Sequence, residues 1–375
     1  MRLETLAVHA GGAPDPETGA LSPPIHLATT FRHGPAGERQ AGYEYVREGN
    51  PTQTRLETAL AALEGGPAAL AFGSGMAAAT ALLETLPSGS ELLIPRDCYA
   101  GLRILATEFL PERGIRTRAV DMTDTAAVER ALGPDVALVW LETPSNPGLE
   151  VTDIAAVAKA ARAADALVAC DNTFATPALQ NPLALGADVV LHSTTKYLGG
   201  HSDVMGGALV FAEQGARYDR VAHRRHITGG VLSPFNAWLT LRGLRSLPAR
   251  MAWNCTTARA VAEFLAGHPA IAAVHYPGLA THPGHATARA QMRDFGAMMS
   301  LRPRGGRDGA LAVAARLQLI TNATSLGGCE STIEHRASVE GAHPVSPPDL
   351  LRLSIGLEHA EDLIADLRQA LDSQA

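Results

Sequence analysis

Between residues 51 and 193 the chain alternates short apolar runs with longer stretches in which apolar residues recur every three or four positions. Runs of the first kind are typical of strands buried on both faces, and stretches of the second kind are typical of amphipathic helices. The alternation therefore predicts an α/β fold, with a mostly parallel central sheet and helices on both of its faces. The expected strands cover residues 68–72, 91–95, 115–122, 135–142, 167–172 and 187–193, and the expected helices cover 51–66, 73–86 and 151–166.

The pattern changes after residue 230, where helical and strand-like stretches become more separate. This arrangement predicts a smaller α+β domain. A long helical tract begins near Val231, and we expect it to break at Pro248 because proline interrupts a helix. The remaining expected elements cover residues 297–304, 309–319, 350–358 and 359–371.

The first 50 residues contain little periodic structure and several glycines and prolines. We expect such a segment to lie as an extended arm on another surface, such as a neighbouring subunit. The expected organisation is an arm over residues 1–50, an α/β domain over 51–230 and an α+β domain over 231–375.

Composition and charge favour a soluble, cytoplasmic protein. The chain has 375 residues, of which 46% are hydrophobic, and a net charge of −7. Its basic residues form no long run, which argues against nucleic-acid binding, and no apolar run reaches membrane-spanning length. The four cysteines form no CxxC pair, and the histidines have no HExxH spacing, so we expect no metal site. A reducing compartment fits these cysteines best.

Lysine usage gives the sharpest compositional signal. Of 31 basic residues only two, Lys159 and Lys196, are lysines, and the others are arginines. Arginine supplies surface charge but cannot be deprotonated, so a rare lysine is expected where an amine is chemically required. Lys159 lies in an amphipathic stretch and is most simply a solvated helix residue. Lys196 follows an apolar strand and precedes a glycine pair, so it is the candidate functional amine.

The residues after the predicted strands match the requirements of pyridoxal phosphate. This cofactor has an aldehyde that needs a lysine and a ring nitrogen that needs a carboxylate. Lys196 can supply the amine, and Asp171 ends the strand predicted over residues 167–172. Ligands of parallel sheets bind at the carboxyl ends of the strands, where both residues are expected.

The phosphate, the ring face and a substrate carboxylate have candidates as well. Gly75 and Met76 open a helix after a glycine turn, and helix N-termini offer free N–H groups to phosphate. Tyr99 follows the strand 91–95 and can lie over the ring, and Arg352 can bind a carboxylate through two parallel hydrogen bonds. Ser193 and Thr195 could add hydroxyl contacts to the phosphate. Taken singly, each of these residues also has an ordinary structural explanation, such as a helix cap, packing or a surface ion pair.

Six stretches carry a resemblance to a known family. They are YEYVREGNPT (43–52), AFGSGMAA (71–78), ETPSNPGLEVTDI (142–154), the block from Asp171 to Gly207, SLGGCES (325–331) and LLRLSIGLE (350–358). Through them the chain resembles the Cys/Met-metabolism pyridoxal-phosphate enzymes of trans-sulfuration over nearly its whole length. The block from Asp171 to Gly207 is the most specific of the six.

The resemblance implies a type I aminotransferase-like fold and a homotetramer built from tight dimers. It implies that Lys196 holds the cofactor as a Schiff base and shuttles protons, that Asp171 pairs with the ring nitrogen, and that Tyr99 stacks on the ring and acts as a base. The implied phosphate ligands are Gly75, Met76, Ser193 and Thr195, with Tyr45 and Arg47 reaching over from a neighbouring subunit. The implied substrate-carboxylate site consists of Asn146, Ser325 and Arg352.

Five positions bear on the branch of the family. Gly101 stands where methionine γ-lyases usually carry a cysteine, and Glu44 matches an acidic residue of cystathionine γ-synthases and γ-lyases. Thr324 replaces the second acidic residue that those enzymes often have. Around His335 and Arg336 the chain departs from a methionine-threonine-histidine pattern, which would alter either the distal substrate pocket or only its rim.

Gly101 and Glu44 favour the γ-synthase and γ-lyase branch, in which substituents are eliminated or replaced at the γ-carbon of sulfur amino acids or homoserine esters, whereas Thr324 counts against a strict specificity for cystathionine. Cystathionine β-lyase, O-acetyl- or O-succinylhomoserine sulfhydrylase and methionine γ-lyase remain alternatives. A plain aminotransferase fits less well because of the block STTKYLGGHSD. A non-catalytic binding protein on this fold would lack at least one of the candidate cofactor or substrate residues named above, and this chain has all of them.

Overall fold

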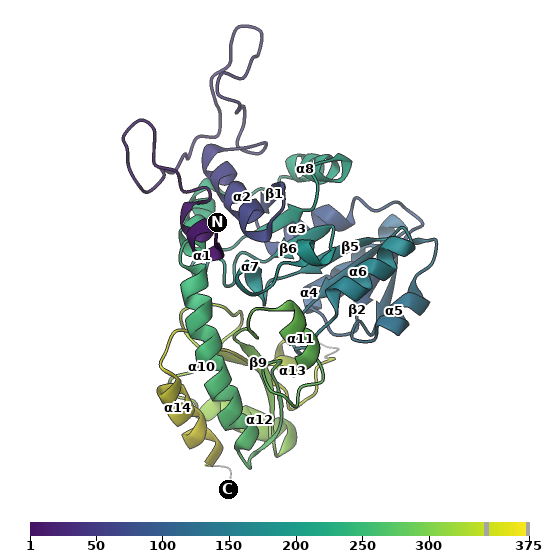
Figure 1. The fold of residues 1–375 in the computed structure, drawn as a ribbon, viewed down its shortest axis with the longest axis vertical. Coiled ribbons are helices and arrows are strands. Elements are labelled where there is room, and N and C mark those ends of the chain that lie inside the picture. The colour runs from purple at the N-terminus through teal and green to yellow at the C-terminus, as the bar shows by residue number, and fades with distance from the viewer. Residues whose placement is uncertain (341–344, 373–375) are drawn as a thin grey trace.

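A computed structural model describes residues 1–340 and 345–372 (Figure 1). Its large sheet has seven strands in the order β1-β7-β6-β5-β4-β2-β3. Every neighbouring pair is parallel except the two pairs that include β7, which confirms the mostly parallel sheet. The strands are β1 (Ala68–Phe72), β2 (Glu91–Pro95), β3 (Arg116–Val120), β4 (Val136–Glu142), β5 (Leu167–Asp171), β6 (Val189–His192) and β7 (Gly207–Phe211).

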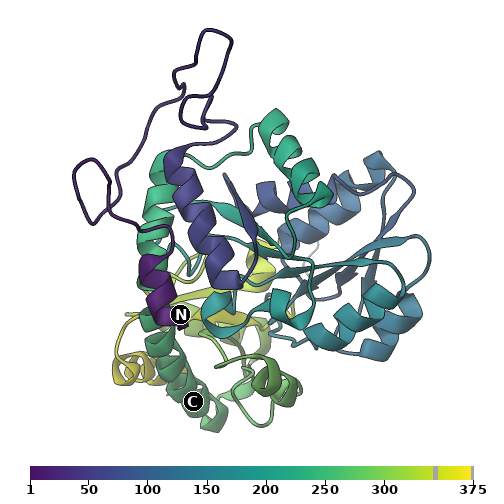
Figure 2. The same ribbon diagram turned by 45° about the horizontal axis from the view of Figure 1, so that its top comes forward.

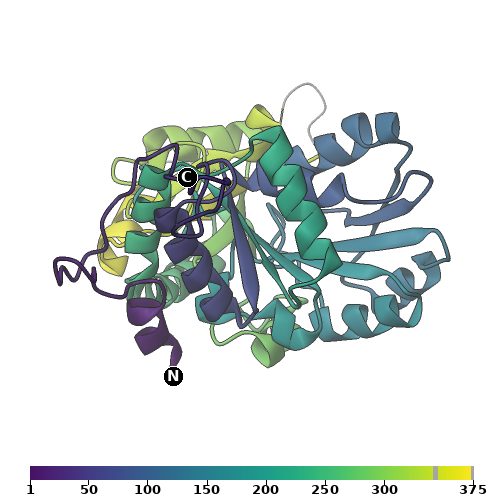
Figure 3. The same ribbon diagram turned by 90° about the horizontal axis from the view of Figure 1, so that it is seen from above.

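Helices cover both faces of this sheet (Figure 3). Alternate residues of one strand belong to different apolar clusters: Leu70 of β1 packs in one cluster, and Ala69 and Ala71 pack in another. This two-sided burial is why the strands read as continuous apolar runs in the sequence. The helices are α2 (Pro51–Glu64), α3 (Gly75–Leu83), α4 (Ala100–Ile104), α5 (Thr125–Ala131), α6 (Ile154–Ala163), α7 (Thr176–Leu179), α8 (Ala216–Thr228) and α9 (Pro234–Leu244).

The second sheet has five strands in the order β10-β11-β12-β9-β8 and is mainly antiparallel. The long helix α10 runs from the region of α1 to this sheet (Figure 1). Residues of both sheets share one apolar cluster with α10, so the two sheets are packed into one body. The elements are α10 (Leu247–Gly267), β8 (Ile271–His275), α11 (His285–Gln291), β9 (Met298–Pro303), α12 (Gly306–Arg316), β10 (Thr321–Asn322), β11 (Thr332–His335), α13 (Arg336–Val339), β12 (Leu351–Ser354) and α14 (Ala360–Asp372).

The expected helix break at Pro248 is wrong by a few residues. Helix α9 ends at Leu244, α10 begins at Leu247, and Pro248 lies in the first turn of α10. Proline is tolerated there because the N–H groups of the first turn have no partner within the helix. Pro248 thus helps to start the second helix.

The N-terminal segment contains a helix that the sequence did not reveal. Helix α1 (Leu3–His9) packs against α2 and α10, and its Ala7 is fully buried. Residues 10–50 form no further helix and extend as loops away from the sheets (Figure 2). The division into three segments at residues 50/51 and 230/231 and the contact of the arm with a neighbouring subunit stay predictions. Among the helices of the described ranges, none combines the length and apolarity that crossing a bilayer requires.

Asp366 fixes the last helix to the small sheet. Its carboxylate on α14 accepts hydrogen bonds from the backbone N–H groups of Gln318, Leu319 and Ile320. Burial alone would raise the pKa of Asp366, but these hydrogen bonds outweigh it and lower the pKa below the ordinary value.

We expect Asp366→Asn to destabilise the protein by about 2 kcal/mol near pH 7, because the amide replaces one of two acceptor oxygens with a donor. A carboxyl with a lowered folded-state pKa stabilises the fold above its unfolded pKa of about 4 and loses that contribution as the pH falls through the folded value. The difference in unfolding midpoint between the two proteins should therefore narrow below about pH 4. Asp362→Asn, on an exposed position of the same helix, is the matched control; an equal loss there would refute the assignment.

Candidate active site

Lys196 lies in a tight turn directly after β6 and is partly exposed. Its Nζ donates a hydrogen bond of 2.6 Å to Ser325 Oγ. Burial and the positive charge of Arg352 lower the pKa of the Lys196 amine to about 8. This amine therefore releases its proton more readily than an ordinary lysine, as a base or a nucleophile requires.

The loop that carries Ser325 reaches Lys196 because a glycine allows it. Gly327 has a φ of 75°, and a Cβ at this position would lie 2.7 Å from Tyr197 N. Only glycine permits this approach. Ser325 itself has a φ of 78°, in the left-handed region that other residues rarely adopt. The local backbone thus places the Ser325 hydroxyl against the amine.

Arg352 connects the two sheets at the site. It lies on β12 and is 4% exposed. Its Nη1 donates to Asn146 Oδ1 at 2.9 Å, and Asn146 follows β4 of the large sheet. Its Nη2 donates to Ser325 O at 3.0 Å. Burial lowers the pKa of Arg352 to about 10, which leaves the guanidinium charged at neutral pH and available to an incoming carboxylate.

The N-terminus of α3 lies beside Ser193. Ser74 caps this helix by accepting a hydrogen bond from Ala77 N. In the hydrogen bonds of the described residues, the N–H groups of Gly75 and Met76 have no acceptor. A Cβ on Gly75 would lie 3.1 Å from Ser193 Cβ, so glycine keeps the space between the helix end and the serine open.

Thr195 is placed beside this space but its hydroxyl is engaged. Its Oγ1 donates to Gly206 O at 3.1 Å and accepts from Gly206 N at 3.0 Å. The hydroxyl proton is therefore committed to the backbone in this conformation. Its role as a phosphate ligand stays a prediction.

Two carboxylates end neighbouring parallel strands at this edge. Asp171 of β5 pairs in register with Glu142 of β4. Asp171 accepts a hydrogen bond from Thr173 N, and none of the described arginines or lysines forms an ion pair with it. Burial raises the pKa of both carboxyls, more strongly for Glu142, and the negative charge of Asp171 adds to the effect on Glu142.

Glu142 is a functional candidate that the sequence analysis missed. Its Oε2 accepts from Tyr99 N at 2.9 Å and its Oε1 accepts from Asn146 N at 2.8 Å. One buried carboxylate thus fixes the backbone of two predicted site residues. The sequence does contain one signal for Glu142: like Asp171, it is a charged residue at the end of an apolar strand.

The Tyr99 ring lies over Gly101. The ring is 44% exposed in the single chain, and a Cβ on Gly101 would lie 2.6 Å from Tyr99 Cε1 and 3.2 Å from Met76 Sδ. A cysteine at position 101 would therefore displace this ring. Gly101, which stands where methionine γ-lyases usually carry a cysteine, thus leaves the Tyr99 ring the space that a side chain would occupy.

The predicted arm residues lie apart from this cluster within one chain. Arg39 donates to Glu44 Oε2 at 2.6 Å. Arg47 donates to His226 O on α8 at 3.0 Å and lies over the Tyr45 ring. Among the described residues, no hydrogen bond or ion pair joins Glu44, Tyr45 or Arg47 to Lys196 or its neighbours. Their roles from a neighbouring subunit stay predictions.

The unusual residues 335 and 336 are buried. His335 is hydrogen-bonded to Ser338 Oγ at 2.6 Å and to Pro348 O at 2.7 Å. Arg336 is 7% exposed and forms an ion pair with Glu334. Neither side chain lies on an exposed rim. Thr324 is exposed beside Ser325.

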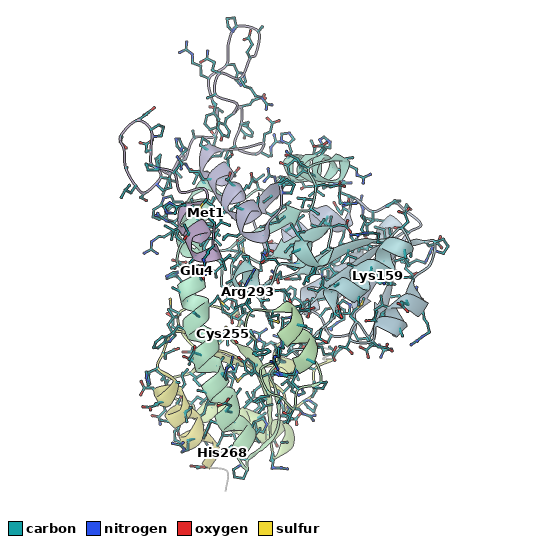
Figure 4. All side chains as sticks on the ribbon, viewed as in Figure 1. Met1, Glu4, Lys159, Cys255, His268 and Arg293 are labelled. Atoms are coloured by element: carbon teal, nitrogen blue, oxygen red, sulfur yellow. The ribbon has the colours of Figure 1, made fainter. Side chains whose placement is uncertain are left out.

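The second lysine is at the surface. Lys159 lies on the exposed side of α6 (Figure 4), as a solvated helix residue should. No group of three or more histidines, cysteines or acidic residues that could hold a metal ion occurs in residues 1–340 and 345–372.

These residues fit pyridoxal phosphate. The cluster offers an amine of lowered pKa, an uncompensated carboxylate and a helix end with free N–H groups, held open by a glycine. A protonated ring nitrogen would compensate Asp171, and a phosphate would accept from Gly75 and Met76. Lys196, Asp171 and the α3 N-terminus come from three segments that meet at one edge of the sheet.

Comparison with known proteins agrees with this chemistry. The family model described as Cys/Met metabolism PLP-dependent enzyme matches residues 4–372. A cystathionine γ-synthase of Mycobacterium tuberculosis is 48% identical, over 98% of this chain and 96% of its own. A cystathionine γ-lyase of Bacillus subtilis is 42% identical over the whole of both chains. The crystal structure of metB from Corynebacterium glutamicum has a TM-score of 0.98 at 42% identity, and covers 100% of this chain and 99% of that one.

The chain therefore belongs to the Cys/Met metabolism family of pyridoxal-phosphate-dependent enzymes. The family, the cofactor and the type of fold that the sequence predicted are confirmed.

We expect Glu142→Gln to lower kcat by about tenfold or more, because the amide cannot accept from both Tyr99 N and Asn146 N and a misplaced catalytic group costs rate. The variant should also alter the pH dependence of the absorbance of the bound cofactor, since a buried negative charge beside Asp171 is removed. Glu129→Gln, at an exposed position of α5, is the matched control. Wild-type kcat and an unchanged spectrum in Glu142→Gln would contradict the assignment.

Proposed function

We propose that this enzyme makes or cleaves cystathionine by chemistry at the γ-carbon of its amino-acid substrate. The observation that carries the proposal is the hydrogen bond from Lys196 Nζ to Ser325 Oγ, directly beside the Arg352 guanidinium. This proximity supports a proton-transferring role for the Lys196 amine beside a binding role of Arg352 for an α-carboxylate. An α-amino acid bound through Arg352 then presents its α- and β-protons to one amine.

The proposed roles follow from this placement. Bound pyridoxal phosphate withdraws electrons from a carbanion on the substrate. Arg352 and Asn146 bind the α-carboxylate and orient the substrate, and Asp171 holds the proton on the ring nitrogen. Lys196 Nζ would remove the α-proton, pass it to the bound cofactor so that the amine is neutral again, and then remove a β-proton, which allows the γ-substituent to leave with its bonding electrons. Its pKa of about 8 supports this role, because a small rise in pH suffices to free the amine.

The phosphate is proposed to bind at the N–H groups of Gly75 and Met76 and at the hydroxyls of Ser193 and Thr195. The free N–H groups at the start of α3 support this assignment. Tyr99 is proposed to stack on the cofactor ring. The Tyr99 ring lies over Gly101, where no side chain displaces it, and this supports the proposal.

We propose the γ-synthase reaction as the main activity of this enzyme and the γ-lyase reaction as a slower second activity. The higher identity to the γ-synthase, 48% against 42% for the γ-lyase, supports this order. Glu44 is proposed to bind the distal amino group of cystathionine or cysteine, in place of its ion pair with Arg39.

A panel of substrates tests the function. We expect O-succinyl- or O-acetylhomoserine with cysteine to give cystathionine, and cystathionine alone to give cysteine, 2-oxobutyrate and ammonia more slowly. Chromatography of the amino acids and an assay of the 2-oxo acids measure both. Formation of homocysteine and pyruvate from cystathionine would identify a β-lyase. Formation of homocysteine from a homoserine ester and sulfide would identify a sulfhydrylase, and release of methanethiol from methionine would identify a methionine γ-lyase. Transamination alone would refute the proposal.

We also propose that the enzyme works in the cytoplasm as a homotetramer of two tight dimers, in which Tyr45 and Arg47 complete the site of the neighbouring subunit. The extended loops of residues 10–50 support this, as does the absence of any bond from these side chains to the Lys196 cluster within the described part of one chain.

Co-expression of two inactive variants tests the shared site. Lys196→Ala should lose the yellow colour and nearly all turnover, and Arg47→Ala should lose most turnover through weak phosphate binding. In a random mixture half of the dimers are hybrids, and each hybrid has one unaltered site, so about a quarter of wild-type activity should return. No recovery, with hybrids verified by two affinity tags, would place Arg47 in the site of its own chain.

A further inference from the structure

Three buried side chains form a row of alternating charge behind the substrate-carboxylate site. Glu334 of β11 pairs in register with Arg352 of β12, and Arg336 follows at the start of α13. One oxygen, Glu334 Oε2, accepts hydrogen bonds from both Arg352 Nη2, at 2.9 Å, and Arg336 Nη1. The three side chains are only 5–9% exposed, so water screens their charges little.

The three side chains carry two positive charges and one negative charge, and Glu340 supplies a second carboxylate at the far end of the row, 3.5 Å from Arg336. Arg352 therefore shares Glu334 with a second cation. Glu334 alone would neutralise Arg352, because a buried carboxylate at hydrogen-bond distance satisfies most of a guanidinium. Arg336 divides the carboxylate between two cations and prevents this.

Glu340 forms a buried ion pair with Arg336 at the far end of the row, where Arg336 Nη2 lies 3.5 Å from Glu340 Oε1. This carboxylate balances Arg336, and among the described residues it forms no ion pair with Arg352. Glu340 also accepts from the backbone N–H groups of Val345 and Ser346, which occupy its other oxygen. Glu340 is thus tied to local donors at the end of the row that is remote from Arg352.

We propose that Arg336 is a specificity-determining positioning residue: by sharing Glu334 with Arg352, it weakens the neutralisation of Arg352 and strengthens the binding of the substrate α-carboxylate. The inference rests on the proposed function for the assignment of Arg352 as the carboxylate ligand. Arg336 does not touch the substrate, because its guanidinium is buried between Glu334 and Glu340. It acts through the charge that Arg352 presents.

Two small ligands isolate the carboxylate. L-2-Aminobutyrate has a substrate-like carbon chain without a leaving group, and propylamine is the same molecule without its carboxylate. Both are titrated into the holoenzyme, and their dissociation constants are read from the absorbance of the bound cofactor. The ratio of the two constants measures the preference for the carboxylate and needs no turnover.

We expect Arg336→Gln to reduce this ratio about tenfold, since one charge a few ångströms behind the guanidinium is lost from a poorly screened site. Arg336→Lys, which keeps the charge, should retain the wild-type ratio within about threefold, and Glu334→Gln/Arg336→Gln, which restores the net charge, should recover most of it. Arg289→Gln, at an exposed position of α11, is the matched control. With a substrate, the loss should raise KM and change kcat little.

The outcomes separate charge from structure. An unchanged ratio in Arg336→Gln would overturn the proposal, and so would an equal loss in Arg336→Lys, because a merely structural arginine is not replaced by lysine. Arg352→Gln should abolish the preference for the carboxylate. If Arg352→Gln keeps the preference, the assignment of Arg352 as the carboxylate ligand is refuted, and with it the role of Arg336, whatever sulfur substrate the panel identifies.

Discussion

The contacts of Arg352 hold the active site together. The guanidinium binds Asn146 after a strand of the large sheet, and the backbone of Ser325 and the carboxylate of Glu334 in the small one. Ser325 in turn receives the hydrogen bond of Lys196. The large sheet supplies Asn146 and Lys196 and the small sheet supplies the other groups, so the reactive amine and the carboxylate site have their geometry only when both sheets are packed together. The shared apolar cluster along α10 provides that packing.

The electrostatics of the site have opposite signs on its two sides. Asp171 and Glu142 place two carboxyls at the end of the parallel sheet, where burial raises the pKa of each. Arg352 places positive charge on the side of the small sheet, and burial together with this charge lowers the pKa of Lys196. A ligand with a cationic ring nitrogen at one end and an anionic carboxylate at the other matches this polarity.

The sequence predicted the parallel sheet well, since residues buried on both faces leave continuous apolar runs. Strand 68–72 agrees with β1 at both ends. Strand β7 was not predicted, because its antiparallel run follows a loop of glycines and polar residues. Helix α1 was not predicted either, because its seven residues are too few for a periodic signal. Lys196 and Asp171 could be found because Asp171 ends one apolar strand and Lys196 closely follows another. The role of Glu142 could not, because it depends on N–H groups from two loops that only the fold brings to one carboxylate.

The attachment of Tyr99 has a consequence for ligand exchange. Its backbone N–H is anchored to Glu142, while the residue is 44% exposed and its ring lies over Gly101. The ring can therefore change rotamer while the backbone stays bound to Glu142. Rotamer changes of exposed side chains occur in picoseconds to nanoseconds, far faster than a typical enzymatic turnover.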